Sequence, residues 1–311
     1  MKVQNHPLRS AITRLSRPPS ALPRLMAIGA FCLLLQSAQA TLLFSDGFNY
    51  TPGINLYAAG SSYQALTSSN TASVAIGSGT LTYPGLSLLP GNEVSVATGN
   101  AAAAQTAASF AAQSSGAVYV SFLLDVTSQA ANQTQNYGMA GLLPTGSGYS
   151  SGGDPCGLLF QGYTNGGFQL GVRSSGGGSG SQHTYASSTL AIGTTYLIVL
   201  KYDYTVGAHG TAYLYIDPSA TTFGGTDPMN PAASNAGSLA TPANLSQFYM
   251  REGGNSLGAS DPSAPYLLDD LEIGTTWADV TPVAVPEPAA AVLIGLGVLG
   301  LALSRRLRRG A

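Results

Sequence analysis

The stretch AVYVSFLLDV, residues 117–126, decides the fold of this chain. Every even position from Val118 to Val126 is apolar, whereas the odd positions are mixed. A period of two residues places alternate side chains on the same face of a strand. The pattern therefore predicts a half-buried β-strand.

Further strand patterns lie on both sides of this stretch. Residues 196–204 and 212–217 flank a turn that contains Gly207 and Gly210, which predicts a β-hairpin. Ala101 to Ala112 is rich in helix-favouring alanine but has no amphipathic face. The body is thus predicted to be all-β, an antiparallel β-sandwich of the jelly-roll type. The other candidate strands, separated by Gly, Ser, Asn and Pro clusters, are residues 157–161, 168–173, 248–251 and 266–273.

The first 40 residues have the pattern of a secretory signal peptide. Four arginines precede an apolar run over residues 25–35, and Ala38-Gln39-Ala40 forms an A-x-A cleavage site. An uncleaved membrane anchor is the alternative, but the run is short for one. Residues 1–40 are therefore predicted to be removed on export, which leaves one domain over residues 41–281.

The last part of the chain, residues 282–311, forms a second signal. The motif at 285–288 is followed by an apolar run over 289–303, which as a helix would span roughly 22 Å of a hydrocarbon core about 30 Å thick. The run is predicted to be a short transmembrane helix, with the terminal arginines on the cytoplasmic side and the body outside. The residues that define this signal are Pro286, Glu287, Pro288, Arg305, Arg306, Arg308 and Arg309.

The Pro-Glu-Pro triplet, the short apolar helix and the Arg cluster, together with the signal peptide, resemble the PEP-CTERM sorting signal of Gram-negative bacteria. The resemblance implies processing by an exosortase, a membrane cysteine protease, and export in bacteria that make extracellular polysaccharide. It implies a protein that is held transiently in the inner membrane and then reaches the cell surface or the extracellular matrix. An ordinary C-terminal tail anchor is the alternative. The resemblance concerns sorting and says nothing of activity.

Charge is distributed unevenly along the chain. Nine of the 12 Lys and Arg residues lie in the two terminal signals, whereas 13 of the 14 acidic residues lie in the body. The body contains only three cationic residues, Arg173, Lys201 and Arg251. Because phosphate binding needs clustered Lys and Arg, we expect no nucleic acid partner.

The two ends of the body resemble concanavalin A-like lectin/glucanase domains, also called laminin-G-like. The resemblance rests on residues 42–48, LLFSDGF, and 268–274, LDDLEIG, and implies that the two ends pair in neighbouring strands. Glucanases of this fold carry a Glu-x-Asp-x-x-Glu strand, which the cluster at 269–272 does not match. Since the sequence shows no carboxylate pair of the kind that glycoside hydrolysis needs, we expect no catalytic residues and no enzyme activity. A glycoside hydrolase or lyase is the alternative.

The strand at 266–273 suggests a metal site. In a regular strand Asp269 shares a face with Leu267 and Leu271, and a buried carboxylate needs a partner. Because the body has few cations, we expect a structural Ca²⁺ with oxygen ligands from Asp269, Asp270 and Asp46. The alternative is that Asp269 lies at a bulge and faces water.

A second candidate site is aromatic. Tyr202 and Tyr204 on one strand and Tyr213 and Tyr215 on the next are predicted to form a platform on which sugar rings stack. Cross-strand tyrosine pairs that stabilise the sheet without a ligand are the alternative. The sequence thus predicts an exported, non-catalytic surface or matrix protein that binds polysaccharide or other matrix components. A purely structural matrix protein without a specific ligand is the competing interpretation.

Overall fold

The computed structural model describes residues 41–66, 74–97, 104–129, 137–148, 154–163, 166–174, 183–237, 244–251 and 264–284. The predicted signal peptide, the Pro286-Glu287-Pro288 triplet, the apolar run at 289–303 and the Arg cluster lie outside these residues. None of the helices within the described ranges is long and apolar enough to cross a membrane.

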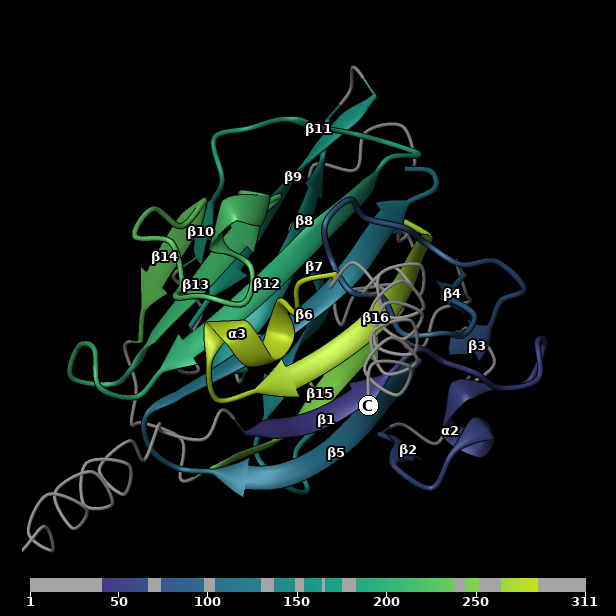
Figure 1. Cartoon of the computed structure of the whole chain (residues 1–311), viewed down its shortest axis with the longest axis horizontal. Coiled ribbons are helices and arrows are strands. Elements are labelled where there is room, and N and C mark those ends of the chain that lie inside the picture. Colours follow the sequence, from purple (N-terminus) through teal and green to yellow (C-terminus); the bar gives the residue numbers. More distant parts are fainter. Residues whose placement is uncertain are drawn as a thin grey trace, which may run out of the picture. The chain divides into compact units, whose positions relative to one another are not determined.

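Two antiparallel sheets of eight strands each make up the body (Figure 1). The strands of sheet A are β1 (Leu42–Asp46), β3 (Val74–Ile76), β4 (Val94–Val96), β6 (Ala117–Val126), β12 (Thr195–Asp203), β13 (Thr211–Ile216), β14 (Ala233–Ala236) and β16 (Tyr266–Gly274). The strands of sheet B are β2 (Tyr63–Ala65), β5 (Gln105–Gln113), β7 (Tyr137–Leu143), β8 (Cys156–Gly162), β9 (Gly167–Arg173), β10 (His183–Tyr185), β11 (Leu190–Ala191) and β15 (Leu245–Arg251).

Strand order differs from chain order in both sheets. Sheet A runs β14-β13-β12-β6-β16-β4-β3, with β1 also paired to β16, and sheet B runs β10-β9-β8-β7-β15-β5-β2, with β11 also paired to β9. The described residues contain little helix: α2 (Leu56–Ala59), α3 (Trp277–Val280) and the 3₁₀ turn η2 (Ala220–Thr222). The all-β, antiparallel prediction is confirmed. The two ends of the body also pair, since β1 lies beside β16.

The two sheets pack on a shared core. The even positions of β6, from Val118 to Val126, are fully buried in it, and the ring of Phe122 lies 5.4 Å from that of Phe248 on β15 of the other sheet. The central odd positions, Tyr119, Ser121 and Leu123, are buried too. Tyr119 and Leu123 contact a second apolar cluster that includes Trp277 of α3, on the outer side of sheet A. The prediction of a half-buried strand is therefore wrong, because α3 and neighbouring segments cover the second face.

Strand β16 contains a bulge that changes which side chains share a face. Its pairing with β6 shifts between Asp269 and Glu272, and Asp270 has a φ of +55°. As a result Leu267 packs on the outer side of sheet A, whereas Leu271 packs in the shared core. The predicted common face of Leu267, Asp269 and Leu271 is wrong, because one extra residue reverses the alternation.

Candidate functional site

The outer side of sheet B carries polar side chains that are each at most 5% exposed, next to a small buried apolar cluster. On β15, Phe248 and Met250 point into the shared core, so Tyr249 and Arg251 point to the opposite side. On β9, Val172 is in the core and Arg173 is on the outer side. We call this surface the arginine face and define it by Gln105, Arg173, Gln247, Tyr249 and Arg251, whose side chains belong to strands β5, β9 and β15.

A buried ion pair lies at the centre of the arginine face. Arg173 donates to Asp154, and the hydroxyl of Tyr249 donates to the other oxygen of the same carboxylate at 2.8 Å. Asp154 is completely buried and Arg173 is 5% exposed. Because a buried charge is costly without a partner, these bonds hold the guanidinium and the phenol in place.

Two glycines provide the space for this arrangement. The pairing register places Arg173, Gly157, Gly141 and Tyr249 in one row across four neighbouring strands. A Cβ atom on Gly157 would collide with the Asp154 carboxylate, and one on Gly141 would lie 2.9 Å from the Tyr249 ring. The row therefore has side chains at its two ends and a bare backbone between them, over which Asp154 lies.

The second arginine lies on the same face, two residues beyond Tyr249. Arg251 pairs with Gln105 of β5, and its Nη1 donates to the Gly138 carbonyl at 3.1 Å. Gln247 is 2% exposed, and its Oε1 has no hydrogen-bond partner among the described residues. A buried amide oxygen without a donor is unfavourable, which suits a position where a ligand supplies the missing hydrogen bond.

Tyr185 borders this surface on β10. Its ring would be 2.8 Å from a Cβ on Gly171, which places it over β9 on the side of Arg173, and the ring of His183 lies 5.3 Å away. Burial raises the pKa of Tyr185, while the charge of Arg173 opposes the shift. The Tyr185 hydroxyl is buried and has no hydrogen-bond partner within the described ranges. The face thus combines two guanidinium groups with uncharged donors and acceptors, a set that suits carboxylate and hydroxyl groups of a ligand.

The sequence contains a signal for this face. Arg173 and Arg251 each end a predicted strand, at 168–173 and 248–251, and each follows a core residue, so parity places both on outer faces. The sequence does not show that β9 and β15 belong to the same sheet.

The structure divides the four predicted sugar-binding tyrosines between two faces. Tyr202 is fully buried in the shared core, where Tyr204 packs beside it with ring centroids 4.9 Å apart. Tyr213 and Tyr215 contact the second apolar cluster on the outer side of sheet A. The reason is register, because Tyr213 and Tyr215 pair with Lys201 and Val199, whereas Tyr202 pairs with Ala212. The four rings do not form a single platform.

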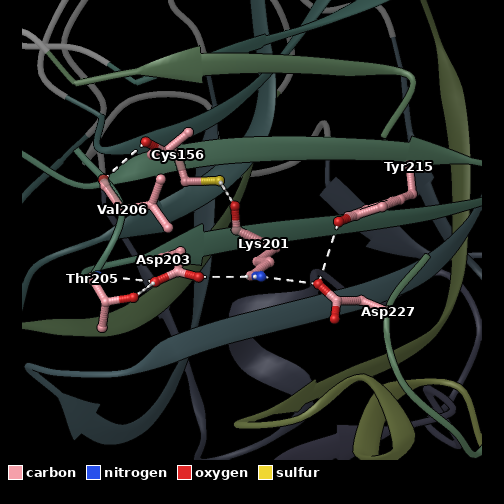
Figure 2. Close-up of polar contacts among 8 residues, drawn as sticks. Cys156, Lys201, Asp203, Thr205, Val206, Tyr215 and Asp227 are labelled. Carbon is pink, nitrogen blue, oxygen red and sulfur yellow. Dashed lines mark hydrogen bonds and ion pairs between the residues drawn. The ribbon is translucent and has the colours of Figure 1, made fainter. Parts of the chain in front are cut away.

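Lys201, the third cation of the body, lies beside Tyr213 and Tyr215. Figure 2 shows its amino group between Asp203 and Asp227, at 3.2 and 2.9 Å. The same amino group lies over the ring of Tyr213, 5.3 Å from its centroid. The backbone carbonyl of Lys201 accepts a weak bond from Cys156 of the other sheet, at 3.8 Å (Figure 2). These contacts attach the segment around Asp227 to sheet A.

The three predicted calcium ligands accept hydrogen bonds from the protein. Asp46 accepts from the hydroxyls of Tyr50 and Tyr63, both at 2.8 Å. Asp269 accepts from the Leu81 amide at 2.8 Å, and Asp270 accepts from the Leu89 amide at 2.7 Å. The side chain of Asp269 lies at the bulge but does not face water, because the residue is 3% exposed.

Calcium binding by these carboxylates stays a prediction. Within the described ranges, no group of three or more His, Cys, Asp or Glu residues is arranged to hold a metal ion. Thermal melting with and without a chelator tests the prediction, and an unchanged midpoint would contradict it.

Comparison with solved structures finds similar arrangements of strands. The endo-β-1,4-glucuronan lyase of the fungus Trichoderma reesei is 14% identical, with a TM-score of 0.48 over 78% of this chain and 99% of its own. An alginate lyase from Aplysia kurodai is 10% identical, with a TM-score of 0.47 over 75% and 99%. The carbohydrate recognition domain of Emp47p is 9% identical, with a TM-score of 0.38 over 76% and 97%.

These neighbours contradict our expectation that the protein is not an enzyme, since two of the three are polysaccharide lyases. That expectation is withdrawn. Identities and TM-scores of this size assign no reaction to this chain, and they do not confirm the concanavalin A-like assignment. No curated protein matches the sequence.

The C-terminal part of the chain gives a specific match. Residues 284–309 match the PEP-CTERM protein-sorting motif, which confirms the sorting signal expected there. The chain therefore carries the signal on which exosortases act, the signal of an exported protein.

Proposed function

We propose that this is an exported protein of the cell surface or extracellular matrix, sorted by an exosortase, whose body binds an acidic polysaccharide at the arginine face. The motif at 284–309 supports the sorting. The signal peptide at 1–40, the membrane helix at 289–303 and the jelly-roll topology of the body belong to the same proposal. Recovery of an intact Arg308-Arg309 terminus from the cell surface, detected by mass spectrometry, would contradict processing.

One observation supports this binding site: of the three cationic residues in the acidic body, Arg173 and Arg251 lie on the same face of one sheet. Arginine binds carboxylates through two parallel hydrogen bonds. Arg173 already binds Asp154, so Arg251 is the arginine that we assign to a carboxylate of the sugar polymer. Gln247 and Tyr185 offer further hydrogen-bonding groups for sugar hydroxyls.

Binding of alginate, compared with a neutral glucan, tests the site by calorimetry on the purified protein. Loss of a charge-assisted hydrogen bond costs about 1.5–3 kcal/mol, so we expect Arg251→Gln to weaken alginate binding roughly tenfold or more. Lys201→Gln is the matched control, because it removes a cation from sheet A and leaves the arginine face intact. Equal affinity of Arg251→Gln and the unmodified protein, or a preference for the neutral glucan, would contradict the proposal.

Cleavage of the same polysaccharide is a second candidate function. The observation that favours it is the Tyr185 hydroxyl, buried and without a partner in the described part of the chain, beside the imidazole of His183. A phenol and an imidazole are groups that transfer protons in enzymes. Incubation with alginate, followed by analysis of chain length, tests this function. Tyr185→Phe should abolish any cleavage, whereas alginate binding should lose only one neutral hydrogen bond, about 0.5–1.5 kcal/mol.

A further inference from the structure

The last described residues, Thr281–Ala284, cross the outer side of sheet A as a short strap. Leu86, which belongs to the second apolar cluster, forms an antiparallel bridge with Val283. The strap is therefore part of the folded body. Its backbone hydrogen bonds run from Gly224 N–H to the Thr281 carbonyl at 2.8 Å, from Ser87 N–H to the Pro282 carbonyl at 2.8 Å, and from Ala284 N–H to the Gly85 carbonyl at 3.3 Å.

Helix α3 anchors the strap. Trp277 is 2% exposed, its ring centroid is 5.0 Å from that of Tyr215, and its Nε1 donates to the Thr222 carbonyl at 3.0 Å. The hydroxyl of Thr281 donates back to the Trp277 carbonyl at 2.8 Å. Because this tryptophan is packed in an apolar cluster, the start of the strap is fixed by burial as well as by backbone bonds.

The strap and the sorting motif overlap in sequence. The motif begins at residue 284, and the amide of Ala284 is bonded to the body. Only Val285 separates Ala284 from Pro286, a span of two residues or at most about 7 Å. From Ala284 to Ala289, where the apolar run begins, the chain makes five Cα-to-Cα steps and spans at most about 18 Å. The structure thus leaves very little free chain between the folded body and the triplet.

We propose that the bound strap limits access of the processing enzyme to the sorting motif, and that release of Thr281–Ala284 exposes it. This inference rests on the proposed processing by an exosortase. A protease must surround the peptide bond that it cuts and needs free chain on both sides of it. Release of the strap adds four residues of free chain, up to about 14 Å. Hydrolysis then adds one water across a single peptide bond, which leaves a carboxylate on the body and an amine on the tail.

An engineered disulfide tests the proposal by holding the strap closed. A Cβ atom on Gly224 would lie 4.0 Å from the Cβ of Val283, within the range of about 3.5–4.5 Å found in disulfides. We expect the double variant Gly224→Cys/Val283→Cys to be processed several-fold more slowly than the unmodified chain in cells that contain an exosortase. A reductant should restore the rate. The native Cys156 is fully buried and does not compete.

Two controls separate restricted access from misfolding. The single variant Gly224→Cys carries the strain of a non-glycine residue at a φ of +66° without the crosslink, and its Cβ would lie 2.9 Å from Cγ2 of Val283 on the strap. Because this contact pushes the strap away from the body, the variant should be processed at least as fast as the unmodified chain. A flexible linker of twelve Gly and Ser residues between Ala284 and Val285 has a root-mean-square length of about 19 Å. Added to the disulfide variant, this linker should restore processing while the strap stays closed.

The processing rates of these variants support or overturn the inference. Slow processing of the disulfide variant that the linker reverses supports limited access. A normal rate with the disulfide formed, or slow processing that the linker does not reverse, overturns the inference and leaves sorting intact. If the unmodified chain is not processed at all, the proposed sorting fails and this inference fails with it.

Discussion

Gly157 shows how much of the arginine face depends on the absence of a side chain. The residue lies under Asp154, which binds both Arg173 and Tyr249. A methyl group there must displace the carboxylate and thereby break a buried ion pair. We expect Gly157→Ala to destabilise the protein by about 3 kcal/mol or more and to weaken alginate binding, measured by thermal melting and calorimetry.

Gly148→Ala is the matched control for this change. Among the described residues its Cβ would contact only Gln105, at an ordinary distance of 3.9 Å, so stability should change by no more than about 0.5 kcal/mol. If Gly157→Ala melts at the temperature of the unmodified protein, the carboxylate moves without cost and our account of the row of residues is wrong.

At the scale of elements, α3 joins the strap to sheet A through two buried side chains, of which Trp277 is larger than Val280. Replacing Trp277 with Ala removes a buried ring from the second apolar cluster and the hydrogen bond to Thr222. We expect a loss of about 3–5 kcal/mol of stability. In hydrogen exchange, the amides of Ser87 and Gly224 should lose protection first, because they bind the strap.

Met229→Ala provides the comparison for the Trp277 variant, since the side chain of Met229 is 96% exposed and its loss should be nearly neutral. Uniform loss of protection over all strands in Trp277→Ala would mean that the strap does not open separately from the sheet.

The elements that the sequence predicted well are those in which local pattern and tertiary packing agree. The alternation over 117–126 identified β6 because its even positions are buried in the shared core. Local propensity and tertiary packing disagree at Ala101–Ala112, which is rich in helix-favouring alanine. Residues 105–113 form strand β5, because pairing with β15 and β2 outweighs the helix propensity of alanine.

It was harder to predict which side chains share a face of a sheet than to predict where the strands lie. The bulge at Asp270 reverses the alternation of side chains along β16. The sequence LDDLEIG does not predict this bulge, because the residue with a positive φ, +55°, is an aspartate and not a glycine. The arginine face joins β9 and β15, which are neighbours only through β8 and β7. Such pairings between distant strands are set by the whole fold, so the candidate site could not be assembled from local spacing.

For the whole molecule, the shortage of cations leaves several carboxyl groups buried without an opposite charge. Burial raises the pKa of Asp269 and of Asp270 to about 6. Burial, with added repulsion from Asp270 and Asp279, raises the pKa of Glu272 to about 8. All three groups bind protons more tightly in the folded state than in the unfolded state.

The sign of the pH dependence follows from these shifts. A group whose pKa rises on folding stabilises the folded state fully at pH values below its unfolded pKa, and this stabilisation is lost as the pH rises to its folded pKa. For Glu272 these two pKa values are 4.5 and about 8. The protein should therefore be most stable at mildly acidic pH. Asp269 and Asp270 finish losing their protons in the folded state near pH 6. Between about pH 6 and 8 the fall in stability is therefore due to Glu272, and a variant without this carboxyl group should show a smaller fall.

Glu272→Gln tests this directly by chemical unfolding at several pH values. The pKa of Glu272 is 4.5 before folding and about 8 after it, and each pKa unit corresponds to about 1.4 kcal/mol. We therefore expect the free energy of unfolding of the variant to exceed that of the unmodified protein by up to roughly 4 kcal/mol at pH 8 and to differ little at pH 4. Asp203→Asn should behave in the opposite way. Burial alone would raise the pKa of Asp203, but hydrogen bonds from Thr205 and the charge of Lys201 outweigh burial and lower it. That variant should lose stability at neutral pH and little in acid, so parallel curves for the two variants would contradict the electrostatic account.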